Sequence, residues 1–465
     1  MSLSVVILAA GKGKRMKSAH PKVLHEVLGR PMLQYVIDAV KPLRPQKVIV
    51  VIGNGADAVK KQISAEGPLS FIIQKELLGT GDALATARKE LKKGAVLVLN
   101  GDCPLITTKT LKMLIEKHKR EKNIVSFLSF MDDAMQGYGR ILRDKKGKVG
   151  EIIEDKHATS DEKKNYKELN GGVYILQTQA LDYLEGIKKN RASGEYYLTD
   201  IIGIISKEGK KLNAYICPAE DIRGVNSRSE LYEIADIIRR RKITGLMDRG
   251  VTFIDPNTSF VHSSVSVGKD TVIYPNTYLE GDTKIGNNCV IFPGARIFKS
   301  LLGRGVIIKD NTIVEESEIG DGSTIGPFAH LRPRTIIGRN VKIGNFVETK
   351  KSSIGNGTKA SHLSYLGDAV IGKDVNIGAG TITCNYDGMN KFQTTIESDV
   401  FIGSDSQLVA PVRIGKGSFV AAGATVTKDV PAGSLAISRV KQQNLENWAK
   451  RKKTVQKSRS NIVRK

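Results

Sequence analysis

An aliphatic residue followed by glycine recurs with a six-residue phase across residues 251–440 of this chain. A period of six matches neither the 3.6-residue turn of an α-helix nor the two-residue alternation of a single strand. It is typical of a parallel β-helix, in which each hexad forms one flat side and a turn, and three hexads, or about 18 residues, close one coil. The aliphatic side chain is expected to point inward, and the small residue after it to let the chain bend at the corner. The dipeptides are Ile285-Gly286, Ile319-Gly320, Ile325-Gly326, Ile337-Gly338, Ile343-Gly344, Ile371-Gly372, Ile377-Gly378, Ile402-Gly403 and Ile414-Gly415.

Four segments interrupt this rhythm, and insertions in repeat proteins commonly form binding surfaces. They cover residues 330–335, 344–355, 359–369 and 381–396. Arg332, Lys350 and Tyr365 in these segments could hold a sugar phosphate. His362 is one of seven histidines, and a lone histidine is ordinarily a surface or satisfied core residue. A functional role for it is favoured by its neighbours in these segments, which are Glu348, Lys350, Tyr365, Asn385 and Tyr386.

The N-terminal part of the chain, over positions 1–226, has a different pattern, in which apolar runs alternate with helical periodicity. Continuous apolar strands between helices indicate a mostly parallel sheet covered on both faces, and ligands of such sheets bind at the carboxyl ends of the strands. The pattern predicts strands over 4–10, 47–52, 71–74 and 95–99, and helices over 55–65 and 107–120.

A length of 465 residues and a hydrophobic content of 40% are sufficient for two or three domains with real cores. No apolar run reaches the roughly 18 residues of a membrane span, so no integral membrane segment is expected. The four cysteines form no CxxC pair and no ligand cluster. We therefore expect a reduced, cytoplasmic protein without structural zinc.

The formal net charge is +24, which raises the question of a nucleic-acid partner. The sequence contains no recognisable nucleic-acid motif and only 6% aromatic residues, so nucleic acid is not expected as a partner. Residues 441–465 form a basic tail that is either a solvated, partly disordered end or a contact for anionic ligands such as cofactor phosphates. Residues 227–250 are expected to form a linking helix that Ser229 caps, with the basic run 239–242 on its solvated face.

The loop after the first predicted strand has the features of a phosphate-binding segment. Gly11 and Gly13 permit close approach of the backbone to a phosphate chain, and Arg15 and Lys22 supply positive charge. The GxGxRM pattern followed by Pro-Lys resembles the signature of the sugar-nucleotidyltransferases, which join a sugar 1-phosphate to a nucleoside triphosphate. Lys14 stands where relatives usually carry threonine or serine, which keeps the loop cationic.

Further matches to this family follow in the same order along the chain. Gln74 and the segment 77–83 resemble the stretch that contacts uracil and ribose, although Asp82 replaces the usual histidine. Asp102 ends a hydrophobic strand, where a carboxylate is well placed for Mg²⁺. The resemblance implies that Asp102 and Asn226 bind the metal and that Arg15 and Lys22 act on the phosphates in catalysis. It implies a site for UTP and the nucleotide sugar made of Leu8, Ala9, Ala10, Gly11, Lys22, Gln74, Gly79, Thr80, Asn100, Gly101, Asp102, Gly139, Glu154, Asn170 and Asn226.

The interrupted coils resemble the acetyltransferase half of the bacterial bifunctional N-acetylglucosamine-1-phosphate uridylyltransferase/glucosamine-1-phosphate N-acetyltransferase family. The resemblance extends from Leu8 to about Val440 with the same domain order. It implies acetyl transfer from acetyl-CoA to glucosamine 1-phosphate, with His362 as general base and Glu348 supporting it. It implies that the sugar phosphate is bound by Arg332, Lys350, Tyr365, Asn376 and Asn385, and acetyl-CoA by Ala379, Asn385, Tyr386, Ser404, Ala422 and Arg439.

The resemblance also implies a fold and an assembly. A Rossmann-like nucleotidyltransferase domain, of the α/β class, is expected over residues 1–226 and a linking helix over 227–250. An all-β left-handed parallel β-helix of hexapeptide repeats is expected over 251–440, before the basic tail 441–465. Members of the family are trimers that associate through the β-helix, and their product is UDP-N-acetylglucosamine, a precursor of peptidoglycan and lipopolysaccharide.

Three functions remain open on the sequence. The first is the bifunctional enzyme, with UTP and acetyl-CoA as co-substrates and Mg²⁺ as cofactor. The second is a pyrophosphorylase whose β-helix serves assembly or regulation, and the set around His362 argues against it. The third is a non-catalytic scaffold, against which the intact Arg15, Lys22, Asp102 and Asn226 argue.

Overall fold

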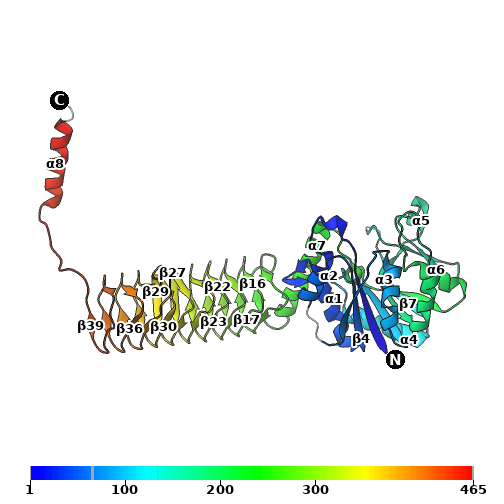
Figure 1. The fold of residues 1–465 in the computed structure, drawn as a ribbon, viewed down its shortest axis with the longest axis horizontal. Helices are drawn as coiled ribbons and strands as arrows, with labels where there is room; N and C mark the ends of the chain where they lie inside the picture. The colour runs from blue at the N-terminus through cyan, green and yellow to red at the C-terminus, as the bar shows by residue number, and fades with distance from the viewer. Residues whose placement is uncertain (1, 64–66, 133–134, 463–465) are drawn as a thin grey trace. The chain divides into compact units, whose positions relative to one another are not determined.

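The chain divides into two units in the computed structural model, which describes residues 2–63, 67–132 and 135–462. One unit comprises Met1–Gly245 with Phe260–Ser264, and the other comprises Leu246–Ser259 with Val265–Lys465. The first unit is an α/β domain and the second a stack of short strands, as the alternating and six-residue patterns predicted (Figure 1).

The first unit begins with β1 and contains α1 to α7 up to Gly245. Its strands are β1 (Leu3–Ala9), β2 (Glu26–Val27), β3 (Arg30–Pro31), β4 (Lys47–Ile52), β5 (Leu69–Ile73), β6 (Ala95–Asn100), β7 (Val125–Met131), β8 (Arg140–Arg143), β9 (Val149–Ile153), β10 (Glu168–Gln177) and β11 (Leu212–Ile216). Its helices are α1 (Met32–Val40), α2 (Ala56–Gln62), α3 (Thr80–Ala87), α4 (Thr108–Glu121), α5 (Ser160–Asn165), α6 (Asp200–Lys207) and α7 (Arg228–Met247). Its 3₁₀ helices are η1 (Lys14–Met16), η2 (Lys22–Leu24), η3 (Lys41–Leu43), η4 (Arg88–Glu90), η5 (Thr178–Gly186) and η6 (Ala219–Ile222).

The central sheet of this unit has the strand order β11-β7-β10-β6-β1-β4-β5. The β4–β5, β1–β4, β1–β6 and β7–β11 pairs are parallel, and only β10 runs antiparallel to its two neighbours in this path, β6 and β7. The prediction of a mostly parallel sheet is therefore confirmed. Because β1 and β6 are parallel neighbours, the loops that follow Ala9 and Asn100 emerge at the same edge.

Helices cover both faces of the sheet, because successive side chains of a strand point to opposite faces. Val5 and Ile7 of β1 pack in one cluster with residues of α1, α2 and α4. Val6 of the same strand packs in another cluster with residues of α3, α6 and η5. The continuous apolar strands are thus explained by burial on both sides.

The predicted elements agree with the structure within a few residues. The strand predicted over 47–52 is β4, and the helix predicted over 107–120 is α4, with Thr107 as its N-cap accepting from the Thr110 backbone N–H at 3.2 Å. The helix predicted over 55–65 is α2 as far as Gln62, and residues 64 and 65 lie outside the described residues.

The linking helix α7 corrects two details of the sequence analysis. The backbone N–H of Glu230 donates to Ser227 Oγ at 3.2 Å, so Ser227 and not Ser229 provides the cap. The basic run is also not a wholly solvated face. Arg239 is 8% exposed and bound to Asp236, and Arg241 donates to the Leu105 carbonyl at 3.2 Å.

The second unit is a parallel β-helix of short strands, which stack as successive coils (Figure 1). Val272 pairs with Val290, and Ile307 pairs with Thr324, so that each strand lies beside the strand one coil further along the chain. The predicted coil of about 18 residues is therefore confirmed. The strands from residue 252 onward are β12 (Thr252–Phe253), β13 (Phe260–Val261), β14 (Ser266–Val267), β15 (Val272–Ile273), β16 (Tyr278–Glu280), β17 (Lys284–Ile285), β18 (Val290–Ile291), β19 (Arg296–Phe298), β20 (Leu301–Leu302), β21 (Ile307–Ile308), β22 (Ile313–Glu315), β23 (Glu318–Ile319), β24 (Thr324–Ile325), β25 (His330–Leu331), β26 (Ile336–Ile337), β27 (Lys342–Lys350), β28 (Ser353–Ile354), β29 (Lys359–Gly367), β30 (Ala369–Ile371), β31 (Asn376–Ile377), β32 (Ile382–Cys384), β33 (Thr394–Ile396), β34 (Phe401–Ile402), β35 (Gln407–Val409), β36 (Val412–Ile414), β37 (Phe419–Val420), β38 (Thr425–Val426) and β39 (Leu435–Ala436).

The repeated glycine has a different role from the one expected. The aliphatic residue before it is buried, as predicted, with Ile319 at 3% exposure and Ile337 at 2%. A Cβ on Gly320 would lie 2.6 Å from the Gly338 carbonyl in the next coil. The left-handed backbone that turns the chain lies just beyond it, at Gly322 with φ +70°. Apart from Gly326, whose own φ is +94°, the repeated glycines are therefore required by the close stacking of coils rather than by the bend itself.

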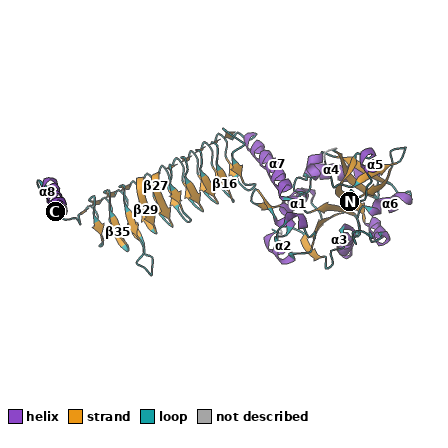
Figure 2. Ribbon diagram, turned by 90° about the horizontal axis from the view of Figure 1, so that it is seen from above, coloured by secondary structure: helices purple, strands orange, loops and turns teal. Residues whose placement is uncertain are grey.

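The interruptions of the repeat change the coils locally. β27 and β29 are nine-residue strands that pair along most of their length, instead of the two- or three-residue strands found elsewhere in the β-helix. The excursion predicted over 381–396 is present, because Cys384 pairs with Val409, a longer step along the chain than in the regular coils. The extra residues form an exposed loop closed by a bridge between Tyr386 and Lys391, and Figure 2 shows a long loop leaving the stack beside β29 and β35.

The basic tail contains a helix that the sequence analysis did not predict, α8 (Trp448–Ile462). Trp448 is 53% exposed, and the Lys452 ammonium lies 4.8 Å from the centre of its indole ring. Within the described residues, no helix combines the length and the apolar character needed to cross a membrane.

Replacing Gly320 by alanine should destabilise the β-helix by about 1–3 kcal/mol, because the new methyl group would force neighbouring coils apart. Gly305 provides a matched control, since it has φ +65° and open space around its Cβ position. Gly305→Asn should cost less, because asparagine tolerates this backbone conformation. Denaturant unfolding of both variants measures the difference, and equal losses would contradict the role assigned to coil stacking.

Candidate functional site

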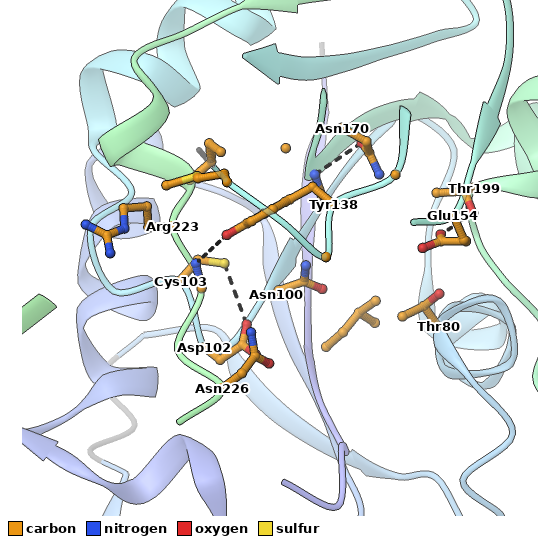
Figure 3. Close-up of a pocket in the computed structure, with 18 of the residues that line it drawn as sticks. Thr80, Asn100, Asp102, Cys103, Tyr138, Glu154, Asn170, Thr199, Arg223 and Asn226 are labelled. Carbon is orange, nitrogen blue, oxygen red and sulfur yellow. Dashed lines mark hydrogen bonds between the residues drawn. The ribbon is translucent and has the colours of Figure 1, made fainter. Parts of the chain in front are cut away.

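Two adjoining cavities, of about 420 and 960 Å³, lie at the carboxyl edge of β1 and β6. They share Leu8, Arg15, Thr80, Asn100 and Asp102 in their walls, together with Glu154 and Asn226. In Figure 3, Asp102 and Asn226 lie on one side of the smaller cavity and Glu154 and Thr80 on the other, with Asn100 between them. The sheet edge predicted from the strand pattern is therefore the edge at which these cavities are found.

Three segments that are far apart in the sequence meet at the Lys22 ammonium. It forms an ion pair with Asp102, which follows β6, and donates to Asn226 Oδ1 at 2.8 Å. The carboxylate and the amide oxygen therefore converge on one cation. Oxygen donors of this kind are the ligands that Mg²⁺ takes together with substrate phosphates, so the residues fit a magnesium ion. In the described part of the chain, no cluster of three or more His, Cys, Asp or Glu side chains suits a metal ion.

The loop after β1 lines the larger cavity from Ala9 to Arg15. Gly13 has φ +57°, and a Cβ there would lie 2.8 Å from the Cβ of Lys22. Glycine at this position therefore allows the two cationic parts of the loop to pack together. Lys12, Lys14 and Arg15 are in the cavity wall with Lys22, which makes this wall strongly positive.

Gln74, Gly79 and Thr80 form the wall on the side of α3. The side-chain Nε2 of Gln74 donates to Asp82 Oδ2 at 2.6 Å and to the Gly79 carbonyl at 3.2 Å. Gly79 has φ +106°, and a Cβ there would lie 2.6 Å from the Tyr196 carbonyl. The carboxylate of Asp82, the residue expected to replace a histidine of the family pattern, thus holds the Gln74 amide in place.

The opposite wall contains Gly139, Glu154 and Asn170. Glu154 accepts from the Thr199 hydroxyl at 2.7 Å, and Asn170 Nδ2 donates to the Tyr174 hydroxyl at 2.6 Å. Of the fifteen residues expected from the resemblance, fourteen line one cavity or the other. Gly101 is the exception, because it packs behind the wall, where a Cβ would lie 3.1 Å from Ala9 Cβ.

Several residues of the cavity wall were not identified from the sequence. Tyr138 accepts from the Gly224 backbone N–H at 3.2 Å, and burial raises the pKa of its hydroxyl to about 12. Thr199 and Arg223 also line the smaller cavity. Tyr138 lies within the same GYGR segment that identified Gly139, so the sequence offered a signal there. No sequence motif identified Arg223 as a wall residue, because the tertiary fold alone brings it to the cavity.

A second group of functional residues gathers around the long strands of the β-helix. Arg332 Nη1 donates to Glu348 Oε1 at 2.7 Å, and Glu348 stands beside Tyr365 in the register of β27 and β29. The pKa of the Lys350 ammonium is lowered by the charge of Lys391 first and by Arg332 second. The Lys350 ammonium therefore lies near two other cations, an arrangement that suits a phosphate. Lys391, on the excursion, was not singled out from the sequence.

His362 has a different partner from the one expected. Its Nδ1 lies 3.0 Å from Asn345 Oδ1, and the two residues are directly paired between β27 and β29. Glu348, the expected support, is instead bound to Arg332. The reason is strand register, since Glu348 lies further along β27 than Asn345 and pairs with Tyr365. An amide oxygen at Nδ1 favours the tautomer that leaves the Nε2 lone pair free.

The remaining residues lie on successive coils near this group. The register of β31, β34 and β37 places Ala379, Ser404 and Ala422 one above another, and Arg439 donates to the Ala422 carbonyl at 2.6 Å. Asn376 opens β31. Asn385 is 7% exposed and donates to Asp368 Oδ2 at 2.6 Å, whereas Tyr386 is 59% exposed on the excursion.

Comparison with known proteins identifies relatives over nearly the whole chain. Residues 5–143 match the MobA-like NTP transferase domain, 256–341 the GMPPB C-terminal domain, and 393–428 the bacterial transferase hexapeptide (six repeats). The chain is 48% identical over 97% of its length to all of the bifunctional protein GlmU of Thermodesulfovibrio yellowstonii. It is 45% identical over 96% of its length to 98% of the protein of that name from Clostridium beijerinckii. A solved UDP-glucose pyrophosphorylase in complex with UDP-glucose is similar over 52% of this chain and 100% of that chain, with 17% identity and a TM-score of 0.44.

The four cysteines should differ in their reaction with iodoacetamide at neutral pH. Cys103, Cys217 and Cys289 are buried, whereas Cys384 is partly exposed. Burial raises the pKa of every one of these thiols, and to about 12 for Cys217, so access should decide the order. Peptide mass mapping over time should show Cys384 labelled first. Labelling of Cys103 at the same rate would contradict the order expected from its 6% exposure.

Proposed function

The chain belongs to the family of the bifunctional GlmU proteins, and we propose that each of its two halves carries out one of the family's two transfer reactions. It is an acetyltransferase and uridylyltransferase that makes UDP-N-acetylglucosamine, the precursor of peptidoglycan and lipopolysaccharide. In the proposed order, glucosamine 1-phosphate is acetylated first, and the product then reacts with UTP.

The observation that carries this assignment is likeness over 97% of one chain, combined with two separate groups of functional side chains. Lys22, Asp102 and Asn226 meet at the sheet edge. On the β-helix, the register of β25 and β27 continues to Arg332 and Lys350, and the charges of Lys391 and Arg332 both act on the Lys350 ammonium. A pyrophosphorylase with a passive β-helix, or a scaffold without activity, would not require both groups.

We assign uridylyl transfer to the first unit. An oxygen of the sugar phosphate attacks the α-phosphorus of UTP, the new P–O bond forms, and pyrophosphate leaves with the electron pair of the bond that breaks. The attacking oxygen is already anionic, so no side-chain base is required. Arg15 and Lys22 would neutralise the α-phosphate and the leaving pyrophosphate, and the cationic loop would hold the phosphate chain in line.

Asp102 and Asn226 are the proposed holders of Mg²⁺, because their oxygens already face a common cation in the Lys22 ammonium. When bound, the ion would supply charge neutralisation for the phosphates. Lys22 would then turn from Asp102 toward the phosphates. The wall of Gln74, Gly79 and Thr80 would contact the base and ribose, and Gly139, Glu154 and Asn170 the sugar.

We assign acetyl transfer to the β-helix, with His362 as the general base. Its Nε2 would take a proton from the glucosamine ammonium, the amine nitrogen would attack the thioester carbonyl, and the carbon–sulfur bond would break to release CoA. Asn345 would orient the imidazole through Nδ1. Glu348 would act on the sugar-phosphate site, where it fixes Arg332 beside Lys350.

Acetyl-CoA is proposed to lie along the column of Ala379, Ser404 and Ala422, with Arg439 at its end and Tyr386 on the excursion beside it. The sugar phosphate would be bound by Arg332, Lys350, Tyr365, Asn376 and Asn385. We propose that three copies associate through the β-helix and complete this site together. Both co-substrates and the reduced cysteines favour a cytoplasmic location.

Two substitutions should separate the activities within one protein. His362→Ala should lower acetyl transfer by roughly 10²–10⁴-fold, because the ammonium would keep its proton, and should leave uridylyl transfer from N-acetylglucosamine 1-phosphate unchanged. Asp102→Asn should lower uridylyl transfer and leave acetyl transfer unchanged. Cys384→Ala is the control in the β-helix. The two activities are measured separately, as release of CoA and release of pyrophosphate. Loss of both reactions in either variant would contradict the assignment of one reaction to each half of the chain.

The molar mass of the protein in solution tests the proposed trimer. Light scattering on the purified protein should give three times the chain mass of 50.7 kDa at micromolar concentration. A mass of 50.7 kDa together with full acetyl transfer would contradict the requirement for a second copy.

A further inference from the structure

The side-chain amide of Gln74, in the proposed base-binding wall, is held by two hydrogen bonds. Gln74 follows β5, is 4% exposed, and lines the larger cavity. Its backbone N–H donates to the Ile52 carbonyl at 2.8 Å, which fixes the residue against β4. Its Nε2 donates to Asp82 Oδ2 at 2.6 Å and to the Gly79 carbonyl at 3.2 Å.

Both of these partners are acceptors, so the orientation of the amide is determined. A carboxylate and a backbone carbonyl offer lone pairs and no hydrogen. An amide flipped end for end would bring its own oxygen against two other oxygens, one of them charged. Both N–H groups of Gln74 are therefore engaged, and the described residues make no hydrogen bond to its Oε1. The polar atom left for a ligand is an acceptor.

We propose that Asp82 is a specificity-determining positioning residue, which locks Gln74 as a hydrogen-bond acceptor and so selects uracil over cytosine. This inference rests on the proposed uridylyl transfer at the same cavity. Asp82 touches no substrate in this scheme and acts through Gln74.

The selectivity follows from the two bases. Uracil carries a hydrogen on N3, which can donate to Gln74 Oε1, whereas N3 of cytosine carries a lone pair. With the amide locked, Gln74 Oε1 would face N3 of cytosine. Both atoms are acceptors, so each would lose its hydrogen bond to water and gain none in return. If the lock is removed, the amide can turn and offer an N–H to cytosine, so discrimination should fall.

The same residue also has an ordinary structural explanation. Asp82 lies in the first turn of α3, where an acidic side chain favours the positive end of the helix dipole. That role predicts a loss of stability when the charge is removed, but no change in the choice of base. The two explanations are therefore distinguished by nucleotide preference and not by thermal stability.

The experiment compares kcat/KM for UTP and CTP with N-acetylglucosamine 1-phosphate and Mg²⁺ in the full-length protein. Asp82→Asn keeps the shape of the side chain and replaces the charged acceptor by an amide that can itself turn. The ratio of the UTP value to the CTP value should fall by about tenfold or more, mainly through a gain with CTP. Glu76→Gln is the matched control, since it removes an exposed carboxylate from the same segment, and its ratio should not change.

An unchanged ratio in a folded Asp82→Asn protein would overturn the inference and leave only the helix-dipole role. If that variant does not fold, Gln74→Met, which removes both donor and acceptor at similar size, must also lower the ratio, and an unchanged ratio there would overturn it equally. Failure of the unaltered protein to react with UTP at all would instead contradict the proposed uridylyl transfer.

Discussion

The ion pair between Lys22 and Asp102 joins the phosphate loop to the end of β6, and the geometry of the first site depends on it. The two residues meet because β1 and β6 pair in parallel, which brings the loops that follow these strands to one edge of the sheet. Asn226, which contributes the third contact, comes from the chain just before α7. One cation thus ties together three segments, and the same oxygens suit Mg²⁺ when phosphates arrive.

The β-helix obeys a different constraint, which is the close stacking of one coil on the next. Where the repeat is regular, glycines such as Gly320 leave no space for a side chain between coils. Where it is interrupted, β27 and β29 lengthen and pair residue by residue, so that Asn345 meets His362 and Glu348 meets Tyr365. The functional side chains therefore lie where the chain departs from the repeat.

The differences between expectation and structure have a common physical origin. Glu348 was expected to support His362 because the family resemblance implies that role, yet the strand register places it where it binds Arg332. Ser227 rather than Ser229 caps α7 because the helix begins at Arg228, earlier than the apolar stripe suggested. Asp82, a departure from the family pattern without an evident role in the sequence, is explained by its contact with Gln74 across the turn that precedes α3.

The sequence by itself determined the two architectures, because a six-residue aliphatic period and continuous apolar strands between helices each fit one arrangement. Through the family resemblance that its motifs carry, it also identified fourteen of the residues that line the first site, because short glycine-rich and acidic motifs at strand ends are recognisable without the tertiary structure. The tertiary structure decided which side chains are partners. Strand register and the approach of distant loops set the contacts of His362, Glu348, Lys350 and Gln74, and no local pattern encodes a distance between residues that are far apart in the chain.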